Sequence, residues 1–101
     1  TGSPGGSRII TTVLQIVLNV IDHQMNIAEA TVAPRMHHQW LPDELRVEEG
    51  FSPDTVRLLE GLGHKVVVKE AMGSTQSIMR TAEGWCGFPD TRQPDGRVAG
   101  Y

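Results

Sequence analysis

Residues 2–8 read GSPGGSR, and they are followed at once by the apolar run IITTVLQIVLNVI at residues 9–21. Two adjacent glycines, Gly5 and Gly6, therefore stand immediately before a segment with the length and apolar spacing of a helix. The first N–H groups of a helix have no intrahelical partner and lie at the positive end of the helix dipole. Paired glycines leave the backbone open to close approach and tolerate φ > 0. The Gly5–Gly6 turn is therefore a candidate site for an anion or a developing oxyanion.

The composition is that of an ordinary globular segment, with 39% hydrophobic and 21% charged residues among 101. This length suffices for one small domain but not for a large enzyme with an enclosed site. The net charge is −3 and the basic residues form no run, so nothing indicates nucleic acid or an anionic membrane as a partner. A single cysteine, Cys86, allows no intrachain disulfide.

Local signals mark where the helices begin. Ser7 is placed to cap the first helix, and Asn26 with Glu29 forms a capping-box pattern for the second. Ser52 followed by Pro53 is a typical helix start. The apolar stripe of residues 9–21 is broader than one helix face, so we expect this helix to be buried on most sides or to lie against a sheet.

The remaining patterns predict an α+β fold, with helices packed on one face of a mainly antiparallel sheet. Residues 35–42 are expected to form a loop, and the tail from Pro89 is expected to be irregular. The run at residues 64–70 is expected to be a buried strand because it is rich in β-branched residues. In chain order, the expected elements are helices at 9–21 and 26–33, a strand at 45–48, a helix from 52, and strands at 64–70, 74–80 and 85–88.

Other residues that could carry chemistry have simpler interpretations. Thr1 is rejected as a nucleophile, because the linker-like GSP that follows it offers no rigid strand to hold the hydroxyl. The pair His37 and His38, with His23 or His64, lacks metal-ligand spacing, so no metal site is expected. Neither the pattern nor the composition calls for a cofactor.

Further polar and aromatic positions are also given structural roles. The pairs Asp43–Glu44 and Glu48–Glu49 are interpreted as solvated, and Cys86 as a buried thiol. Trp40 and Trp85 are interpreted as core or interface anchors. The hydroxyl-rich stretch GSTQS at residues 73–77 either lines a polar pocket or satisfies neighbouring backbone groups.

Several segments, in order, resemble bacterial γ-glutamyltransferase (γ-glutamyltranspeptidase). They are GSPGGSRII at residues 2–10, NIAEA at 26–30, APR at 33–35, HHQW at 37–40 and EAMGSTQSI at 70–78. Their order and extent place residues 1–101 as the C-terminal part of that family's small subunit rather than as a complete catalytic domain. The agreement weakens at residues 87–92, GFPDTR, where the family tends to have Gly-Ala-Ser-Asp-Pro-Arg.

The resemblance implies an N-terminal-nucleophile hydrolase, a four-layer αββα sandwich made from one autocleaved precursor. In that family a threonine attacks the γ-glutamyl carbonyl of glutathione or a related amide, and water or an amino acid or peptide then accepts the glutamyl group. The two glycines of the family motif, which match Gly5 and Gly6, supply the oxyanion-hole N–H groups. The nucleophile lies upstream of this segment, so the chain alone is expected to be inactive. No cofactor or metal is implied.

The resemblance also implies the partners: the rest of the small subunit, the large subunit and a small γ-glutamyl substrate. It places the parent protein in the periplasm or outside the cell. Two alternatives remain open, a related acylase (cephalosporin acylase or poly-γ-glutamate depolymerase) and a non-catalytic interaction or scaffold domain. Because residues 9–21 are apolar on so many sides, the isolated segment is expected to self-associate.

Overall fold

The computed structural model describes residues 1–100, which contain three helices and five strands. They divide into two compact units: Thr1–Ala33 with the chain from Gly73 on, and Pro34–Met72. No helix among the described residues is both long enough and apolar enough to cross a membrane.

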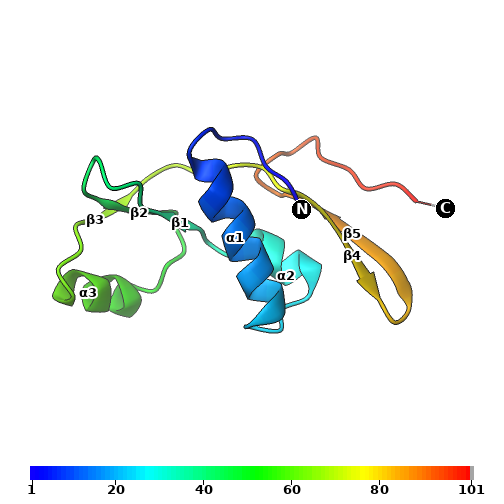
Figure 1. Ribbon diagram of the computed structural model, residues 1–101, viewed down its shortest axis with the longest axis horizontal. Coiled ribbons are helices and arrows are strands. Elements are labelled where there is room, and N and C mark those ends of the chain that lie inside the picture. The colour runs from blue at the N-terminus through cyan, green and yellow to red at the C-terminus, as the bar shows by residue number, and fades with distance from the viewer. Residues whose placement is uncertain (101) are drawn as a thin grey trace. The chain divides into compact units, whose positions relative to one another are not determined.

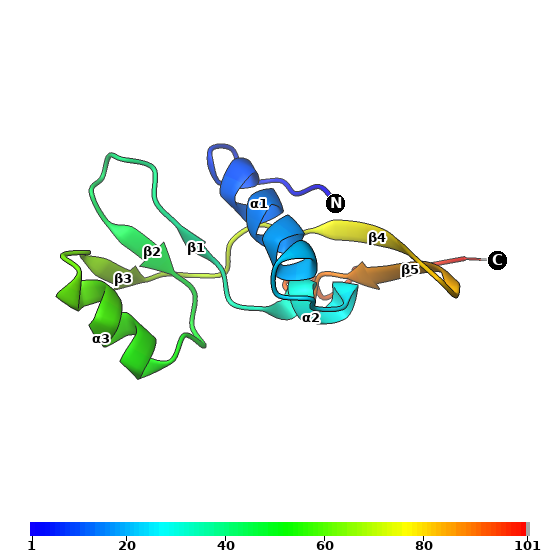
Figure 2. The same cartoon turned by 60° about the horizontal axis from the view of Figure 1, so that its bottom comes forward.

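The first unit contains α1 (Arg8–Ile21), α2 (Ile27–Val32), β4 (Gln76–Thr81) and β5 (Gly84–Pro89). Strands β4 and β5 form an antiparallel hairpin, and α2 contacts both of them as well as α1 (Figures 1 and 2). The small core lies between these elements. Its buried residues are Ile16, Ile27 and Ala30, against which Val20, Met25, Met79 and Phe88 pack.

The second unit contains β1 (Met36–His37), β2 (Leu45–Val47), α3 (Pro53–Gly61) and β3 (Val66–Val68). The sheet order is β1-β2-β3, with β1 antiparallel and β3 parallel to β2. Parallel neighbours need a crossover connection, and α3 lies within it (Figure 1). Leu45 and Val47 on the central strand are buried.

The helix and hairpin signals of the sequence are confirmed. Asn26 accepts a hydrogen bond from the Glu29 N–H at 2.9 Å, and the Glu29 carboxylate accepts one from the Asn26 N–H at 3.0 Å. Pro53 begins α3 after the capping residue Ser52. The α+β class is also confirmed, and two of the three strand pairings are antiparallel.

Four expectations were wrong in detail. Ser7 makes no side-chain cap hydrogen bond. The expected loop at 35–42 contains β1, which is too short to show an alternating pattern. β3 spans only Val66–Val68 and is half-buried to exposed, because it is an edge strand of the sheet. In α1 only Thr12 and Ile16 are buried, since these 100 residues supply little apolar surface to cover the other faces.

Candidate active site

The Gly5–Gly6 turn precedes α1 and needs glycine for its backbone conformation. Gly5 has φ +135° and Gly6 has φ +60°, and L side chains rarely adopt such angles. The Gly5 carbonyl accepts a hydrogen bond from the Arg8 N–H at 3.2 Å, and the Gly6 carbonyl accepts one from the Ile9 N–H at 3.1 Å. These bonds occupy two of the N–H groups that a helix start leaves without partners.

The same bonds orient the glycine amides. In a planar trans peptide the C=O and the N–H point to opposite sides. Because the Gly5 carbonyl faces Arg8, the Gly6 N–H points away from the first turn of α1. The Pro4 carbonyl accepts a hydrogen bond from the Ser3 hydroxyl at 2.8 Å, so the Gly5 N–H points away from that hydroxyl. Within residues 1–100 neither glycine N–H donates a hydrogen bond, and both residues are exposed.

Hydrogen bonds to β4 and the segment before it hold the residues that lead into this turn. Gly2 and Gln76 exchange backbone hydrogen bonds of 3.2 and 3.0 Å, and the Ser74 N–H donates to Ser3 Oγ at 3.1 Å. The Ser77 hydroxyl donates to Thr1 Oγ1 at 2.7 Å. The turn is therefore attached on one side to α1 and on the other to the segment at 73–77.

The hydroxyl-rich stretch at residues 73–77 matches neither of the two expected roles fully, the lining of a polar pocket or the satisfaction of neighbouring backbone groups. The Thr75 N–H and hydroxyl both donate to the buried Asp90 carboxylate, at 2.7 and 3.2 Å. Ser77 bonds another hydroxyl rather than the backbone. The hydroxyl-rich stretch therefore joins the N-terminal segment to the region after β5.

The histidines do not form a metal centre in the described part of the chain. Across residues 1–100, no three His, Cys, Asp or Glu side chains gather in a group that could hold a metal ion. The His37 ring shares a hydrogen bond with the Gln39 side chain (3.0 Å), and the His38 ring one with the Asp43 carboxylate (3.2 Å).

Three structural roles assigned from the sequence were wrong. Cys86 is exposed on β5 rather than buried. Trp40 and Trp85 are 80% and 75% exposed, so the core role assigned to them is wrong, and the alternative role as interface anchors stays a prediction. Glu48 is buried rather than solvated, because its carboxylate accepts hydrogen bonds from the backbone N–H groups of Arg35 (2.9 Å) and Met72 (2.5 Å).

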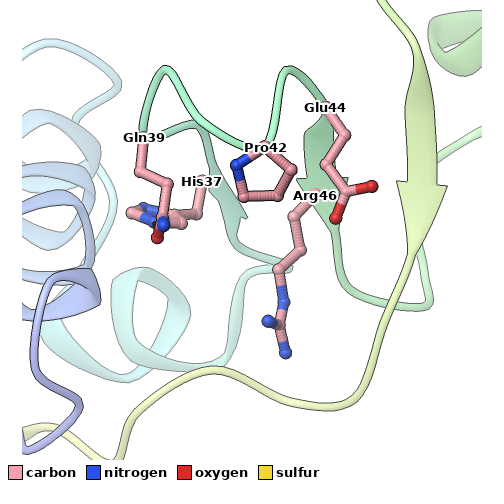
Figure 3. A pocket seen from close by; sticks show the side chains of 5 residues that line it. All are labelled: His37, Gln39, Pro42, Glu44 and Arg46. Atoms are coloured by element: carbon pink, nitrogen blue, oxygen red, sulfur yellow. Dashed lines mark hydrogen bonds between the residues drawn. The ribbon is translucent and has the colours of Figure 1, made fainter.

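The second unit has a polar pocket of about 130 Å³ that the sequence did not indicate. Figure 3 shows His37 and Gln39 side by side, with the Arg46 guanidinium directed away from the Glu44 carboxylate. Arg46 pairs with Glu70, and its Nε is buried without a hydrogen-bond partner among the described residues. The lining residues are spread over β1, the following loop and β2, so no local motif announces the pocket. The residues that line it are His37, Gln39, Pro42, Glu44 and Arg46.

Comparison with known proteins identifies the family of the chain. The family described as Gamma-glutamyltranspeptidase matches residues 1–101. The chain belongs to this family. The glutathione hydrolase proenzyme of Escherichia coli is 69% identical over 102 residues, a match that covers 100% of this chain and 18% of that protein. The chain thus spans about a fifth of the length of this relative.

Solved structures agree with this assignment. A mutant γ-glutamyltranspeptidase from Helicobacter pylori superimposes with a TM-score of 0.84 at 49% identity, over 91% of this chain and 52% of that chain. A cephalosporin acylase from Bacillus halodurans gives a TM-score of 0.87 at 32% identity, over 99% of this chain and 19% of that chain. Members of the γ-glutamyltranspeptidase family and a related acylase therefore share the fold of this chain.

Proposed function

We propose that this chain is the C-terminal part of the small subunit of a γ-glutamyltransferase/glutathione hydrolase, to which it contributes the oxyanion hole. The complete protein cleaves γ-glutamyl amides through a γ-glutamyl-enzyme. It then transfers the glutamyl group to water or to an amino acid or peptide. The Gly5 and Gly6 N–H groups stabilise the negative charge that develops on the γ-carbonyl oxygen.

The chemistry requires a nucleophile from outside this chain. Its threonine hydroxyl loses a proton and attacks the γ-carbonyl carbon, and the carbonyl oxygen becomes an oxyanion. When the carbon–nitrogen bond breaks, the amine leaves with a proton and the acyl-enzyme remains. Two N–H donors held in place before the reaction stabilise the intermediate more than the substrate, which is how binding energy raises kcat.

The observation that supports this role is the orientation of the two amides. Both belong to peptides whose carbonyls are engaged, Pro4 with Ser3 and Gly5 with Arg8, so their N–H groups are fixed without being consumed. No metal or cofactor enters the proposal. The isolated chain is proposed to be inactive because the nucleophile belongs to another part of the protein.

The proposed partners follow from the length of the match. The rest of the small subunit and the large subunit complete the αββα sandwich, and a relative named as a proenzyme supports processing of one precursor. A solved acivicin-inhibited γ-glutamyltranspeptidase is described as having critical roles for its C-terminus in autoprocessing and catalysis. By the same resemblance, the parent protein is proposed to be periplasmic or secreted.

A cephalosporin acylase is the second candidate, because the Bacillus halodurans enzyme superimposes with a TM-score of 0.87. An oxyanion hole made of backbone N–H groups serves any acyl transfer, so Gly5 and Gly6 fit both reactions. The substrate distinguishes them: the γ-glutamyltransferase cleaves γ-glutamyl anilides, and the acylase removes the side-chain acyl group of a cephalosporin.

The test uses a chimera in which this chain replaces the matching residues of the Escherichia coli glutathione hydrolase proenzyme. Gly6→Val adds a branched side chain next to the proposed N–H donor. The control Gly63→Val introduces a side chain at another position with positive φ (+97°) and open surroundings. Gly6 has a φ of +60° and also has open surroundings within residues 1–100, so in both variants the new Cβ meets no other atom and lies at a positive φ.

We expect Gly6→Val to lower kcat for γ-glutamyl anilide hydrolysis by about 10²- to 10³-fold, the usual cost of losing one oxyanion donor. Gly63→Val is expected to leave kcat within about twofold, because an isolated surface change has only a small effect. Equal rates of acylation in the Gly6→Val variant and the unmodified chimera would remove the assignment. Cleavage of cephalosporins but not of γ-glutamyl anilides by the complete natural protein would favour the acylase.

A further inference from the structure

The Ser3 hydroxyl joins two segments that are 71 residues apart in the sequence. It donates a hydrogen bond to the Pro4 carbonyl at 2.8 Å and accepts one from the Ser74 N–H at 3.1 Å. A hydroxyl has one donor hydrogen and two acceptor lone pairs, so it makes both bonds at once. Ser3 therefore links the backbone of residue 74 to the peptide between Pro4 and Gly5.

That peptide carries one of the two proposed oxyanion donors. The Pro4 carbonyl and the Gly5 N–H belong to the same planar group, and the bond is trans. Rotation of this peptide would move both atoms together. A hydroxyl that holds the carbonyl thus fixes the direction of the N–H on the opposite side. The Gly6 N–H does not depend on Ser3, because α1 holds the preceding carbonyl through Arg8.

The Ser3 hydroxyl occupies the space that a Cβ at Gly73 would fill. The φ of Gly73 is +69°, and a Cβ at this position would overlap Ser3 Oγ and come within 3.3 Å of Thr12 Cγ2. Close contact of this kind forces a neighbour to move, and the hydroxyl is its nearest atom. Gly73 is therefore required twice, for its backbone angle and for the close approach of Ser3.

We propose that Ser3, seated against Gly73 and Ser74, is a positioning residue that sets the direction of the Gly5 N–H in the oxyanion hole. This inference rests on the proposed function, since it concerns the orientation of one of its two donors. Ser3 acts through the peptide and does not contact the reacting atoms. Removal of its hydroxyl leaves the N–H present but no longer held in direction.

The experiment measures single-turnover acylation, KM and thermal stability in the same Escherichia coli chimera. Ser3→Ala removes the hydroxyl, and Ser3→Thr keeps one. Gly73→Ala introduces the Cβ that displaces the hydroxyl. The matched control is Gly63→Ala, which places the same methyl group at a positive φ of +97° with no atom within 4 Å.

We expect Ser3→Ala to lower the acylation rate about tenfold, less than the 10²- to 10³-fold loss of a whole donor. KM is expected to change less than twofold, because the substrate carbonyl carries little charge before the attack. Ser3→Thr is expected to restore most of the rate. Gly73→Ala is expected to lower the rate as well, and to have a smaller effect in the Ser3→Ala background, because the displaced hydroxyl is then absent.

Three outcomes would overturn the inference. In the first, Ser3→Ala retains the full acylation rate while Gly6→Val loses it, and the proposed function stands without a role for Ser3. In the second, the acylation rate of Ser3→Ala falls by no more than the fraction of folded protein falls, or Ser3→Thr does not recover the acylation rate. In the third, Gly6→Val is fully active, and the inference fails together with the proposed function. If Gly73→Ala does not fold, the comparison of Ser3→Ala with Ser3→Thr decides the question.

Discussion

Replacement of Arg92 by methionine tests the network that holds the chain after β5 to the rest of the first unit. The Asp90 carboxylate is fully buried, and it accepts hydrogen bonds from Thr75 and Arg92. The Arg92 side chain is 11% exposed, and its guanidinium also donates to the carbonyls of Thr31 at 2.9 Å and Ala33 at 3.1 Å. Arg92→Met removes the cation and its guanidinium hydrogen bonds to Asp90 and to both carbonyls, while the bonds from Thr75 and from the backbone N–H of residue 92 remain.

The expected cost is set by the burial of this pair. Removal of one partner from a buried ion pair typically costs about 3–5 kcal/mol, because a desolvated charge is left uncompensated. We therefore expect at least about 3 kcal/mol, a large share of the 5–15 kcal/mol that stabilises an ordinary domain. The control Arg80→Met removes an exposed cation from β4 and is expected to cost less than about 0.5 kcal/mol.

Amide hydrogen exchange of the chimera, read by mass spectrometry on peptides covering residues 73–77, measures this effect locally. Exchange of the Thr75 N–H reports directly on the Asp90 network, because this N–H donates to the Asp90 carboxylate at 2.7 Å. A loss of 3 kcal/mol corresponds to exchange that is about 10²-fold faster, and Arg80→Met is expected to leave it within about twofold. Exchange in Arg92→Met that matched the Arg80→Met control would refute the reasoning.

Three further predictions concern stability and association. Glu48→Gln replaces one of the two carboxylate oxygens that accept buried N–H groups, and we expect it to lower the free energy of unfolding in urea by about 1–3 kcal/mol. The control Glu49→Gln changes an exposed neighbour and is expected to be neutral, so equal urea midpoints for the two variants would contradict the prediction. Asn26→Ala is expected to lower the free energy of unfolding by about 1 kcal/mol and Ser7→Ala by less, because of these two residues only Asn26 makes a side-chain cap hydrogen bond. A larger loss of stability in Ser7→Ala than in Asn26→Ala would contradict this prediction. The isolated chain is expected to self-associate through the exposed apolar face of α1, and sedimentation as a compact monomer that binds no hydrophobic dye would rule this out.

Local sequence signals were sufficient for the helices and the hairpin. The capping box of Asn26 and Glu29 and the start at Ser52 depend on residues within one turn, and the structure confirms both. β1 could not be predicted, because a two-residue strand has no periodicity and exists only through its pairing with β2. The burial of Glu48 was missed for a related reason, since its partners are backbone groups 13 and 24 residues away.

The candidate site was predicted in part. The sequence indicated Gly5 and Gly6 because glycines before an apolar helix expose backbone N–H groups. It did not indicate Ser3 or Gly73, because their contact joins positions 70 residues apart. The pattern of a single segment also could not indicate that the Pro4 carbonyl is held by a side-chain hydroxyl. Motifs therefore indicate the proposed donors, and the tertiary contacts indicate what would orient them.

The most direct test of the central claim replaces the amide of Gly6 by an ester in the chimera, through incorporation of glycolic acid at this position. The change removes one N–H and adds no side chain. We predict a loss in kcat of about 10²- to 10³-fold with unchanged thermal stability, because this N–H donates no hydrogen bond within residues 1–100. An ester at Gly63, whose N–H donates to the Glu60 carbonyl at 2.9 Å, is expected to lower stability instead and to leave kcat unchanged. Full acylation activity with the ester at Gly6 would contradict the claim that its amide stabilises the oxyanion.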